Sequence, residues 1–465
     1  MTYLTVPFFT YVFSILPVWP LWLATNLAAM YLLLFRERFD PRTFVFWVAI
    51  VFVLPFLGFL LYLGWGSTIA LRRDGARKES EDRRFMQGES DDVPEPCRRM
   101  ASAMSSSGAD ICTGGNSAYL LWRADEAFQS MMRDISGAAR SVHLVLVRLP
   151  AGDHGRRFVD VLCRKAAEGV DIRIITDRLG FGRTHGLHRL KAAGVRHSTF
   201  HSPIHAAFSL KPVNRCLREI CAIDGRLSYC GMGSYVRIEG PASERLDRRF
   251  MADWAHASGE DVSVPEAPHA ECAGDCNVQA VQSGPDSQGM PMLNGFSEMI
   301  AGARKTLYMA FPYLVPEDEA YSAIKQAVIA GTDVRILIPM ECSHWYQRWN
   351  TLSAANPLIE AGAHVYFSRK ATVRSIAVAD GRICVVGSGL YNTRSMWADY
   401  GENVVVYSEA LSAEAVGRFM DDFEGAVECE PDEYRRRSFM DKLRICIARL
   451  FMFLNRCGLS FSIPL

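Results

Sequence analysis

The chain has 465 residues, of which 22% are charged and 49% are hydrophobic. This composition suits folded domains and excludes a predominantly disordered chain. The 51 basic and 51 acidic side chains give a formal net charge of zero, so no overall positive field favours binding to nucleic acid. The thirteen cysteines are scattered and odd in number, which favours free thiols in a reducing compartment over a disulfide framework.

Two long uncharged runs lie near the beginning of the chain. The first is Phe8 to Phe35 and the second is Thr43 to Ala70; each could cross about 30 Å of hydrocarbon as a helix. A signal peptide is the competing interpretation of the first run, but no basic region precedes it and the run is too long. We expect residues 1–70 to form two transmembrane helices. More basic residues follow the second run than separate the two runs, which favours a cytoplasmic globular body.

The rest of the chain alternates helical and strand patterns and does so twice. A basic and polar linker is predicted at residues 71–117, a first α/β repeat at 118–256, a second linker at 257–277 and a second α/β repeat at 278–430. The segment EGVDIRIITD of the first repeat corresponds to AGTDVRILIP of the second. Length and pattern therefore predict an α/β body made of two related halves.

Each repeat contains a strong hairpin signal, in which alternating apolar residues lead to Asp-Gly and a second apolar run follows. The segment ICAIDGRLSYCGMGS at Ile220–Ser234 aligns with IAVADGRICVVGSGL at Ile376–Leu390, which places Asp224 on Asp380. The chain is therefore predicted to be an internal duplication.

Residues 431–465 combine a basic start with the apolar run Leu443–Leu454, which contains two arginines. A basic amphipathic helix of this kind either lies in a bilayer interface or packs on the body, and the sequence leaves both alternatives open. The second linker contains His269, Cys272 and Cys276, but no fourth ligand lies at a standard spacing. No metal ion and no cofactor are expected.

The two apolar runs, the two repeats and their Asp-Gly turns resemble the bacterial cardiolipin synthases of the phospholipase D superfamily. The segments FPYLVPEDEA, VQSGPD, RIEGPA and RFMADW contribute to the resemblance, which covers nearly the whole chain. It implies two transmembrane helices followed by two tandem phospholipase D-like α/β repeats packed into one bilobed body. It also implies a place in the bacterial inner membrane as a multi-pass protein, with membrane phospholipid as the ligand.

In enzymes of that family each repeat carries the motif H-x-K-x(4)-D, and the Asp precedes the Gly of the turn. One His attacks a phosphodiester and the other protonates the leaving alkoxide, while the lysines neutralise the phosphoryl oxygens. With the register set on the two aspartates, the motif positions are occupied by Leu217, Glu219, Asp224, Val373, Ser375 and Asp380. Both His positions are therefore aliphatic, and neither Lys position keeps its positive charge.

Asp before Gly is also what a hairpin turn favours, so the retained aspartates indicate a structural role at least as strongly as a catalytic one. Two displaced residues are candidates for a rescued chemistry, Cys216 and His205. A one-residue slip would be needed to use Cys216, and such a slip turns the side chain to the opposite face of the strand.

The sequence therefore predicts a membrane-anchored protein of phospholipid metabolism that keeps a cardiolipin-synthase architecture and has lost phosphotransfer. Its role would be lipid binding, or regulation or scaffolding of an active phospholipid-synthesising enzyme. Two alternatives stay open: an active phosphatidyltransferase or phosphodiesterase with displaced catalytic residues, and an inert structural membrane protein.

Overall fold

The computed structural model describes residues 18–456, apart from residues 38–40, 55, 87, 89–92, 94, 96, 148, 150–151, 178–185, 201–214, 263–270, 317, 343, 370–373, 390–395, 397–398 and 430–437. The N-terminal elements are α2 (Val18–Tyr31), the π-helical turn η1 (Leu32–Arg36), α3 (Pro41–Val53), α4 (Leu57–Leu61), the π-helical turn η2 (Tyr62–Gly66), α5 (Ile69–Asp82) and α6 (Arg98–Ser106). The C-terminal helix is α18 (Phe439–Arg456).

The two repeats contain the same succession of elements. The first comprises β1 (Cys112–Leu121), α7 (Ala124–Ser136), β2 (Ser141–Leu146), α8 (Gly152–Ala167), β3 (Asp171–Thr176), α9 (Leu187–Ala192), β4 (Arg196–Thr199), β5 (Ile220–Ile223), β6 (Leu227–Met232), β7 (Ser234–Glu239) and α11 (Pro241–Ser258). The second comprises β8 (Cys276–Ser283), α12 (Pro291–Gly302), β9 (Thr306–Ala310), α13 (Asp318–Ile329), β10 (Asp333–Pro339), α14 (Trp345–Ala361), β11 (His364–Ser368), β12 (Ile376–Ala379), β13 (Ile383–Gly387), β14 (Gly401–Tyr407) and α16 (Glu409–Glu424). The short strand β15 (Val427–Glu428) follows α16. The predicted α/β duplication is confirmed.

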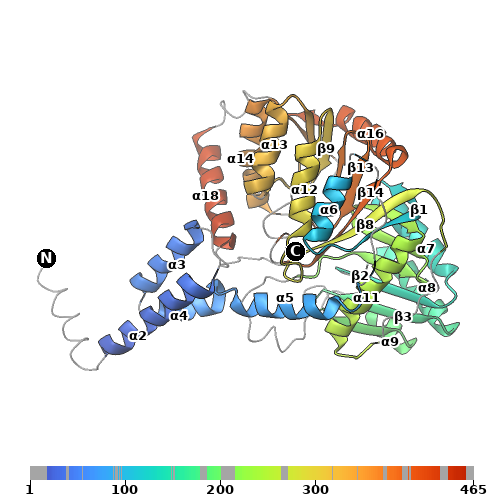
Figure 1. The fold of residues 1–465 in the computed structure, drawn as a ribbon, viewed down its shortest axis with the longest axis horizontal. Helices are drawn as coiled ribbons and strands as arrows, with labels where there is room; N and C mark the ends of the chain where they lie inside the picture. The colour runs from blue at the N-terminus through green and yellow to red at the C-terminus, as the bar shows by residue number, and fades with distance from the viewer. Residues whose placement is uncertain are drawn as a thin grey trace, which may run out of the picture.

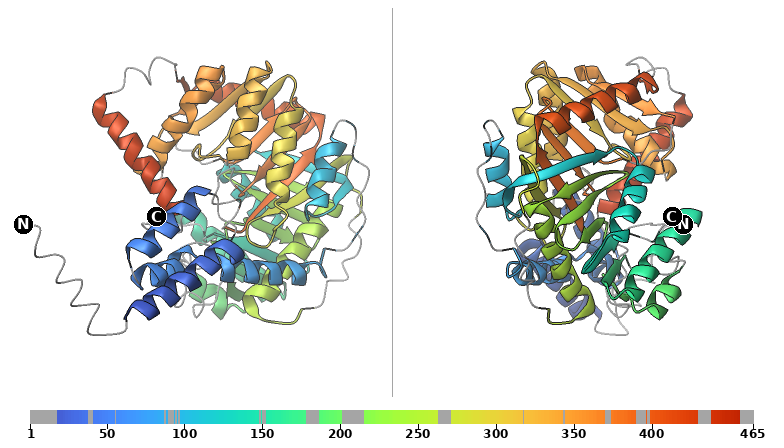
Figure 2. Two further views of the ribbon diagram at one scale, coloured as in Figure 1. Left: turned by 60° about the vertical axis from the view of Figure 1, so that its left-hand side comes forward. Right: turned by 90° about the vertical axis from the view of Figure 1, so that its right-hand side faces the viewer.

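One sheet of fifteen strands runs through both repeats, in the order β15-β11-β10-β9-β12-β13-β14-β8-β1-β7-β6-β5-β2-β3-β4. The order on one side of the β8–β1 pair mirrors the order on the other side. Both predicted hairpins are present, because β5 pairs with β6 and β12 with β13 in antiparallel register. Helices cover the outer faces of the sheet (Figure 1 and Figure 2).

The core between the repeats is shared. One cluster of buried side chains includes Val236 and Phe250 of the first repeat together with Val378, Val404 and Phe419 of the second. Because burial of apolar surface is the main favourable term in folding, this shared cluster holds the two repeats together as one body.

The expectation of two transmembrane helices is wrong for the described part of residues 1–70. Among the described residues, no helix has both the length and the apolar character needed to cross a membrane. A crossing takes roughly 20 residues, whereas α2 has 14 residues and α3 has 13. Helix α3 ends just before Pro55, and α4 covers only five residues before η2 begins. A proline disfavours helical geometry in the residue before it, which explains the break in the second run. The first residues of the first run, up to residue 17, lie outside the described residues.

Helix α18 packs on the body, which is one of the two alternatives that the sequence left open. The side chain of Asn350 on α14 donates a hydrogen bond to the backbone oxygen of Ala448 at 2.9 Å. The ring of Phe453 meets the ring of Phe46 on α3, with centroids 5.5 Å apart. The C-terminal helix therefore also contacts the N-terminal helices, and both lie on the same side of the molecule (Figure 1).

Candidate functional site

Both retained aspartates bind the backbone of a neighbouring strand. The carboxylate of Asp224 accepts hydrogen bonds from the N–H groups of residues 139–141 at 2.7 to 2.9 Å. The carboxylate of Asp380 accepts the equivalent bonds from residues 304–306, also at 2.7 to 2.9 Å. Each aspartate has a positive φ, 55° and 50°, which Asp tolerates in a turn. These carboxylates connect the hairpin turns to the starts of β2 and β9.

The structure brings the first motif segment to the seam between the repeats. The N–H of Leu217 donates to the backbone oxygen of Tyr400, and the N–H of Tyr400 donates to Arg215, each at 2.8 Å. Glu219 is half-buried, and its carboxylate accepts a hydrogen bond from the hydroxyl of Tyr235. Burial and this carboxylate raise the pKa of Tyr235 well above its usual value, so the phenol stays the proton donor of the pair.

The second motif segment reaches the same seam from the other side. Ser375 is buried, and its N–H donates to the backbone oxygen of Met232 in the first repeat at 3.2 Å. Its own oxygen accepts from Gly387 at 3.3 Å, just as Glu219 accepts from Gly231 at 3.4 Å. The two Lys positions of the motif therefore hold equivalent backbone positions. Val373 lies outside the described residues.

Glycine is required where these hairpins make closest contact. A β-carbon at Gly231 would lie 2.1 Å from the backbone oxygen of Ser234, and one at Gly387 would lie 2.4 Å from the α-carbon of Asn403. No side chain fits at either distance. The glycine in the second strand of each hairpin is therefore needed for that strand to pack closely against its neighbour.

Of the two candidates for a displaced catalytic residue, the structure describes only one. Cys216 is fully buried, and its backbone N–H donates to a carboxylate oxygen of Asp177 at 2.9 Å. Burial raises the pKa of its thiol well above the usual value, which keeps the sulfur protonated and a weak nucleophile. His205 lies outside the described residues.

Arg218, between the two motif positions, lies at the centre of a buried ion cluster. Its guanidinium donates to the carboxylate of Asp253 on α11 at 2.6 Å and to that of Asp286, after β8, at 2.7 Å. Its Nε lies 3.5 Å from a carboxylate oxygen of Glu402 on β14. All four side chains are inaccessible to solvent, or nearly so. The cluster therefore joins elements of both repeats.

The carboxyl groups of this cluster have pKa values that are shifted in opposite directions. Burial raises the pKa of Glu402 to about 7, against the lowering effect of Arg249 and Arg218. Burial alone would also raise the pKa of Asp286, but Arg218 and Lys78 hold it well below its usual range. The pKa of Asp253 is also below its usual value, because the same two cations outweigh the effect of burial. At neutral pH the two aspartates are therefore ionised, while Glu402 is close to its midpoint.

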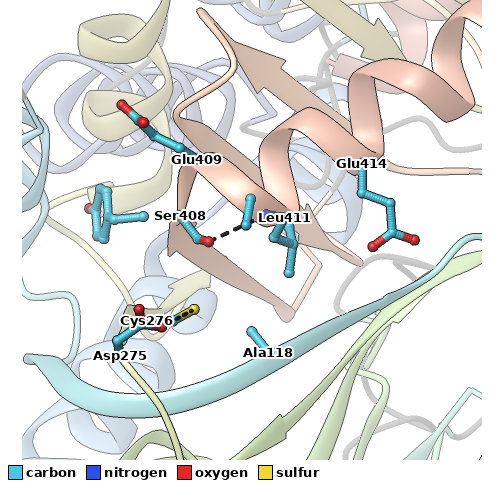
Figure 3. A pocket seen from close by; sticks show the side chains of 9 residues that line it. Ala118, Asp275, Cys276, Ser408, Glu409, Leu411 and Glu414 are labelled. Atoms are coloured by element: carbon cyan, nitrogen blue, oxygen red, sulfur yellow. Dashed lines mark hydrogen bonds between the residues drawn. The ribbon is translucent and has the colours of Figure 1, made fainter.

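A separate hollow of about 440 Å³ lies between β1, β8 and the beginning of α16 (Figure 3). Its lining includes the carboxyl groups of Asp275, Glu409 and Glu414. The hydroxyl of Ser408 accepts from the N–H of Leu411 at 3.3 Å and so caps α16. Acidic residues in the lining do not favour the binding of a phosphate group in this hollow.

Among the described residues, no three or more His, Cys, Asp or Glu side chains are placed to hold a metal ion. Of the three linker residues considered from the sequence, Cys272 is exposed, Cys276 lines the hollow, and His269 lies outside the described residues.

Comparison with known proteins gives matches in sequence and in fold. A family model described as the PLD-like domain of cardiolipin synthase matches residues 296–425. The cardiolipin synthase of Clostridium perfringens (strain SM101 / Type A) is 25% identical over 449 residues, covering 89% of this chain and 94% of that protein. The major cardiolipin synthase ClsA of Bacillus subtilis (strain 168) is 26% identical over 468 residues, covering 91% and 96%. The chain is thus similar to bacterial cardiolipin synthases over 89% to 91% of its length, which supports an assignment to that family.

A solved structure has a similar fold. The crystal structure of phosphatidylserine synthase from Haemophilus influenzae Rd KW20 superposes with a TM-score of 0.55, at 10% identity, over 74% of this chain and 94% of that one. At that level of identity the likeness shows a shared fold alone, and the name phospholipase D-like comes from the family model.

The chain also contains a second arginine–aspartate pair, which was not predicted from the sequence. Arg374 binds the carboxylate of Asp422 on α16, as Arg218 binds Asp253 on α11. The signal was present in the duplication, because RFMADW in the first repeat corresponds to RFMDDF in the second. In both halves an arginine lies directly after the family's His position and pairs with the aspartate of this segment.

Proposed function

We propose that this chain is a phospholipid-binding member of the cardiolipin synthase family that does not catalyse phosphatidyl transfer. The proposal rests on the loss of the His and Lys residues of both motifs. Leu217 and Val373 stand at the His positions and Glu219 and Ser375 at the Lys positions. Transfer through a phosphohistidine needs a nucleophile with a free electron pair and a general acid, and aliphatic side chains supply neither.

The electrostatics at the first Lys position support the same conclusion. Glu219 presents a carboxylate at the position where the family places a cation, and Tyr235 holds it by a hydrogen bond. A negative charge here raises the energy of a phosphoryl group whose own negative charge must be stabilised in the transition state. Cys216 does not replace the lost nucleophile, because it is buried with a raised pKa.

The proposed ligand is membrane phospholipid, and the proposed place of action is the bacterial membrane. The relatives' names point to a phospholipid product. Large apolar side chains are also exposed on the N-terminal helices and on α18, and a lipid surface would cover them. Those on α18 are Phe439, Met440, Leu443, Ile447 and Leu450. We further propose that the protein regulates or scaffolds an active phospholipid-synthesising enzyme.

The second candidate function is an active cardiolipin synthase that uses residues outside the family motif. It is favoured by the relatives, because named cardiolipin synthases align with 89% to 91% of this chain. In that case the nucleophile would come from a residue such as His205.

Expression in a bacterium that lacks its own cardiolipin synthases separates the two candidates. Lipids are extracted and analysed by mass spectrometry, with an active cardiolipin synthase as the positive control. We expect no cardiolipin and no new phospholipid from this chain, while phospholipid co-purifies with the protein. New cardiolipin that disappears in His205→Ala would overturn the proposal and establish the second candidate.

A further inference from the structure

Lys78 on α5 and Arg218 before β5 bind the same two carboxylate oxygens. The Nζ of Lys78 lies 2.8 Å from Oδ1 of Asp253 and 3.1 Å from Oδ2 of Asp286. The guanidinium of Arg218 lies 2.6 Å and 2.7 Å from these same atoms. If Lys78 moves away, the carboxylates that hold Arg218 lose half of their positive partners. Arg218 lies in the segment 215–219 before β5, which carries the His and Lys positions of the first motif.

Helix α5 lies outside the two repeats in the chain, yet it enters their seam. Figure 1 shows it running from the N-terminal helices to α11. At Gly75 its backbone approaches Pro285 so closely that a β-carbon would lie 2.1 Å from the Pro285 oxygen. At its beginning, the carboxylate of Glu37 accepts from the N–H of Thr68 at 2.8 Å and from the hydroxyl of Tyr62 at 3.1 Å. Helix α5 therefore connects the apolar N-terminal helices to the seam.

The charges in this cluster balance only when one acid is neutral. The described residues contribute three cations and four carboxyl groups, namely Lys78, Arg218, Arg249, Asp82, Asp253, Asp286 and Glu402. Glu402 has the longest contacts, 3.5 Å to Arg218 and 3.8 Å to Arg249. A buried charge without a full partner is costly, so the neutral form of Glu402 fits the closed cluster.

We propose that this cluster is a latch between α5 and residues 215–219, the segment before β5. The neutral form of Glu402 holds the latch closed, and ionisation of that carboxyl weakens it. The latch would let a displacement of the N-terminal helices reach the motif segment at the seam. It goes beyond the proposed function, because it holds whether or not the chain catalyses a reaction.

The direction of the pH dependence follows from linkage. The pKa of Glu402 is raised to about 7 in the closed cluster and returns to about 4.3 when the group is solvated. Opening therefore releases a proton between these two values. The closed form loses stability as the pH rises from about 4.3 to about 7, and the loss levels off above that range.

Of the other titratable groups around the cluster, Glu79 on α5 gives a change in the same direction, because burial raises its pKa. Asp253 and Asp286 have lowered pKa values and stay ionised across the range. His256 on α11 has a pKa lowered by burial and by Lys78, so its protonation favours opening as the pH falls, which is the opposite direction. Further groups that face the cluster are Asp74 on α5, Cys216 before β5, Cys230 on β6, and Tyr400. All of these are unchanged in a Glu402→Gln variant, so the difference from wild type isolates Glu402.

Amide hydrogen exchange of the full-length protein at pH 5.5 and pH 7.5, corrected for intrinsic rates, tests the latch. We expect protection of peptides from residues 69–86 to fall on the order of tenfold at the higher pH. Glu402→Gln should keep the high protection at both pH values, and Glu409→Gln, at an exposed position of α16, should behave as wild type. The latch is ruled out if wild-type protection is the same at both pH values. It is also ruled out if Glu402→Gln retains the wild-type change or does not fold.

A second variant tests the coupling to the motif segment. Lys78→Met should raise exchange in α5 at both pH values and also expose the N–H of Leu217, which donates to Tyr400. Arg77→Gln, on the exposed side of the same helix, is the matched control and should change neither region. Faster exchange in α5 with unchanged exchange at Leu217 would contradict the coupling.

Discussion

The guanidinium of Arg374 in the second repeat lies over the indole ring of Trp122 in the first, 4.7 Å from its centroid. Both side chains bind the carboxylate of Asp422, so this aspartate holds a contact between the repeats. Arg218 occupies the equivalent position of the first repeat and contacts three carboxyl groups. The arginine–aspartate pair is therefore present in both repeats, but its surroundings differ between them.

We expect Arg374→Met to destabilise the protein by about 3 kcal/mol, because Asp422 is left without its cation in a partly buried place. Arg218→Met should cost more, since it removes a cation that three buried carboxyl groups share. Urea unfolding measures both. Arg382→Met, whose partner Glu409 is exposed, should cost less than about 1 kcal/mol. Equal losses for all three variants would show that the ion pairs do not hold the repeats together.

Asp224 and Asp380 should contribute equally to the stability of the fold, and neither should take part in catalysis. Asp224→Ala and Asp380→Ala each remove an acceptor of three backbone N–H groups, so each should cost about 1–3 kcal/mol. Thermal unfolding is the measurement, and Asp421→Ala, at an exposed position, is the control. A variant that keeps full stability and changes the lipid output would instead indicate a catalytic aspartate.

Cysteine labelling of the native protein tests whether Cys216 is a nucleophile. Cys272 and Cys446 are exposed and should react with iodoacetamide, whereas Cys216 should stay unmodified until denaturant is added. Mass spectrometry of tryptic peptides reads out each site. Modification of Cys216 at the rate of Cys446 would point to an accessible thiolate and favour the second candidate function.

Restoring the motif residues should create activity if only those residues are missing. The variant carries Leu217→His, Glu219→Lys, Val373→His and Ser375→Lys. We expect turnover of phosphatidylglycerol at least about tenfold above wild type, because it regains the nucleophile, the general acid and both cations. The matched control replaces Leu217→His with Leu217→Gln and should remain at the wild-type level. No gain would show that the surrounding site has changed as well.

Local signals predicted much of the fold. The Asp-Gly turns and the period-two strands fixed both hairpins, because a shift of one residue would turn every side chain of a strand to the other face. The assignment of Leu217, Glu219, Val373 and Ser375 to the motif stays a prediction. The transmembrane prediction failed because apolar length alone does not register a helix break such as the one before Pro55.

The buried ion cluster could not be predicted from the sequence in this way. Its members come from five separate segments of the chain, from Lys78 on α5 to Glu402 on β14. No spacing rule connects them, and each charged residue alone resembles an ordinary surface residue. The repeated RFM-x-D segment was the one local sign of the arginine pairs.

The central β1–β8 pair joins the two halves of the mirrored sheet edge to edge. If the chain were divided at residues 257–277, each half would expose the backbone of its first strand as an unpaired edge. The two strands are counterparts in the duplication, so the exposed edge of one half could pair with a second copy of itself. A separated half would therefore be expected to form symmetric dimers or to aggregate, and the covalent link between the repeats makes that pairing intramolecular.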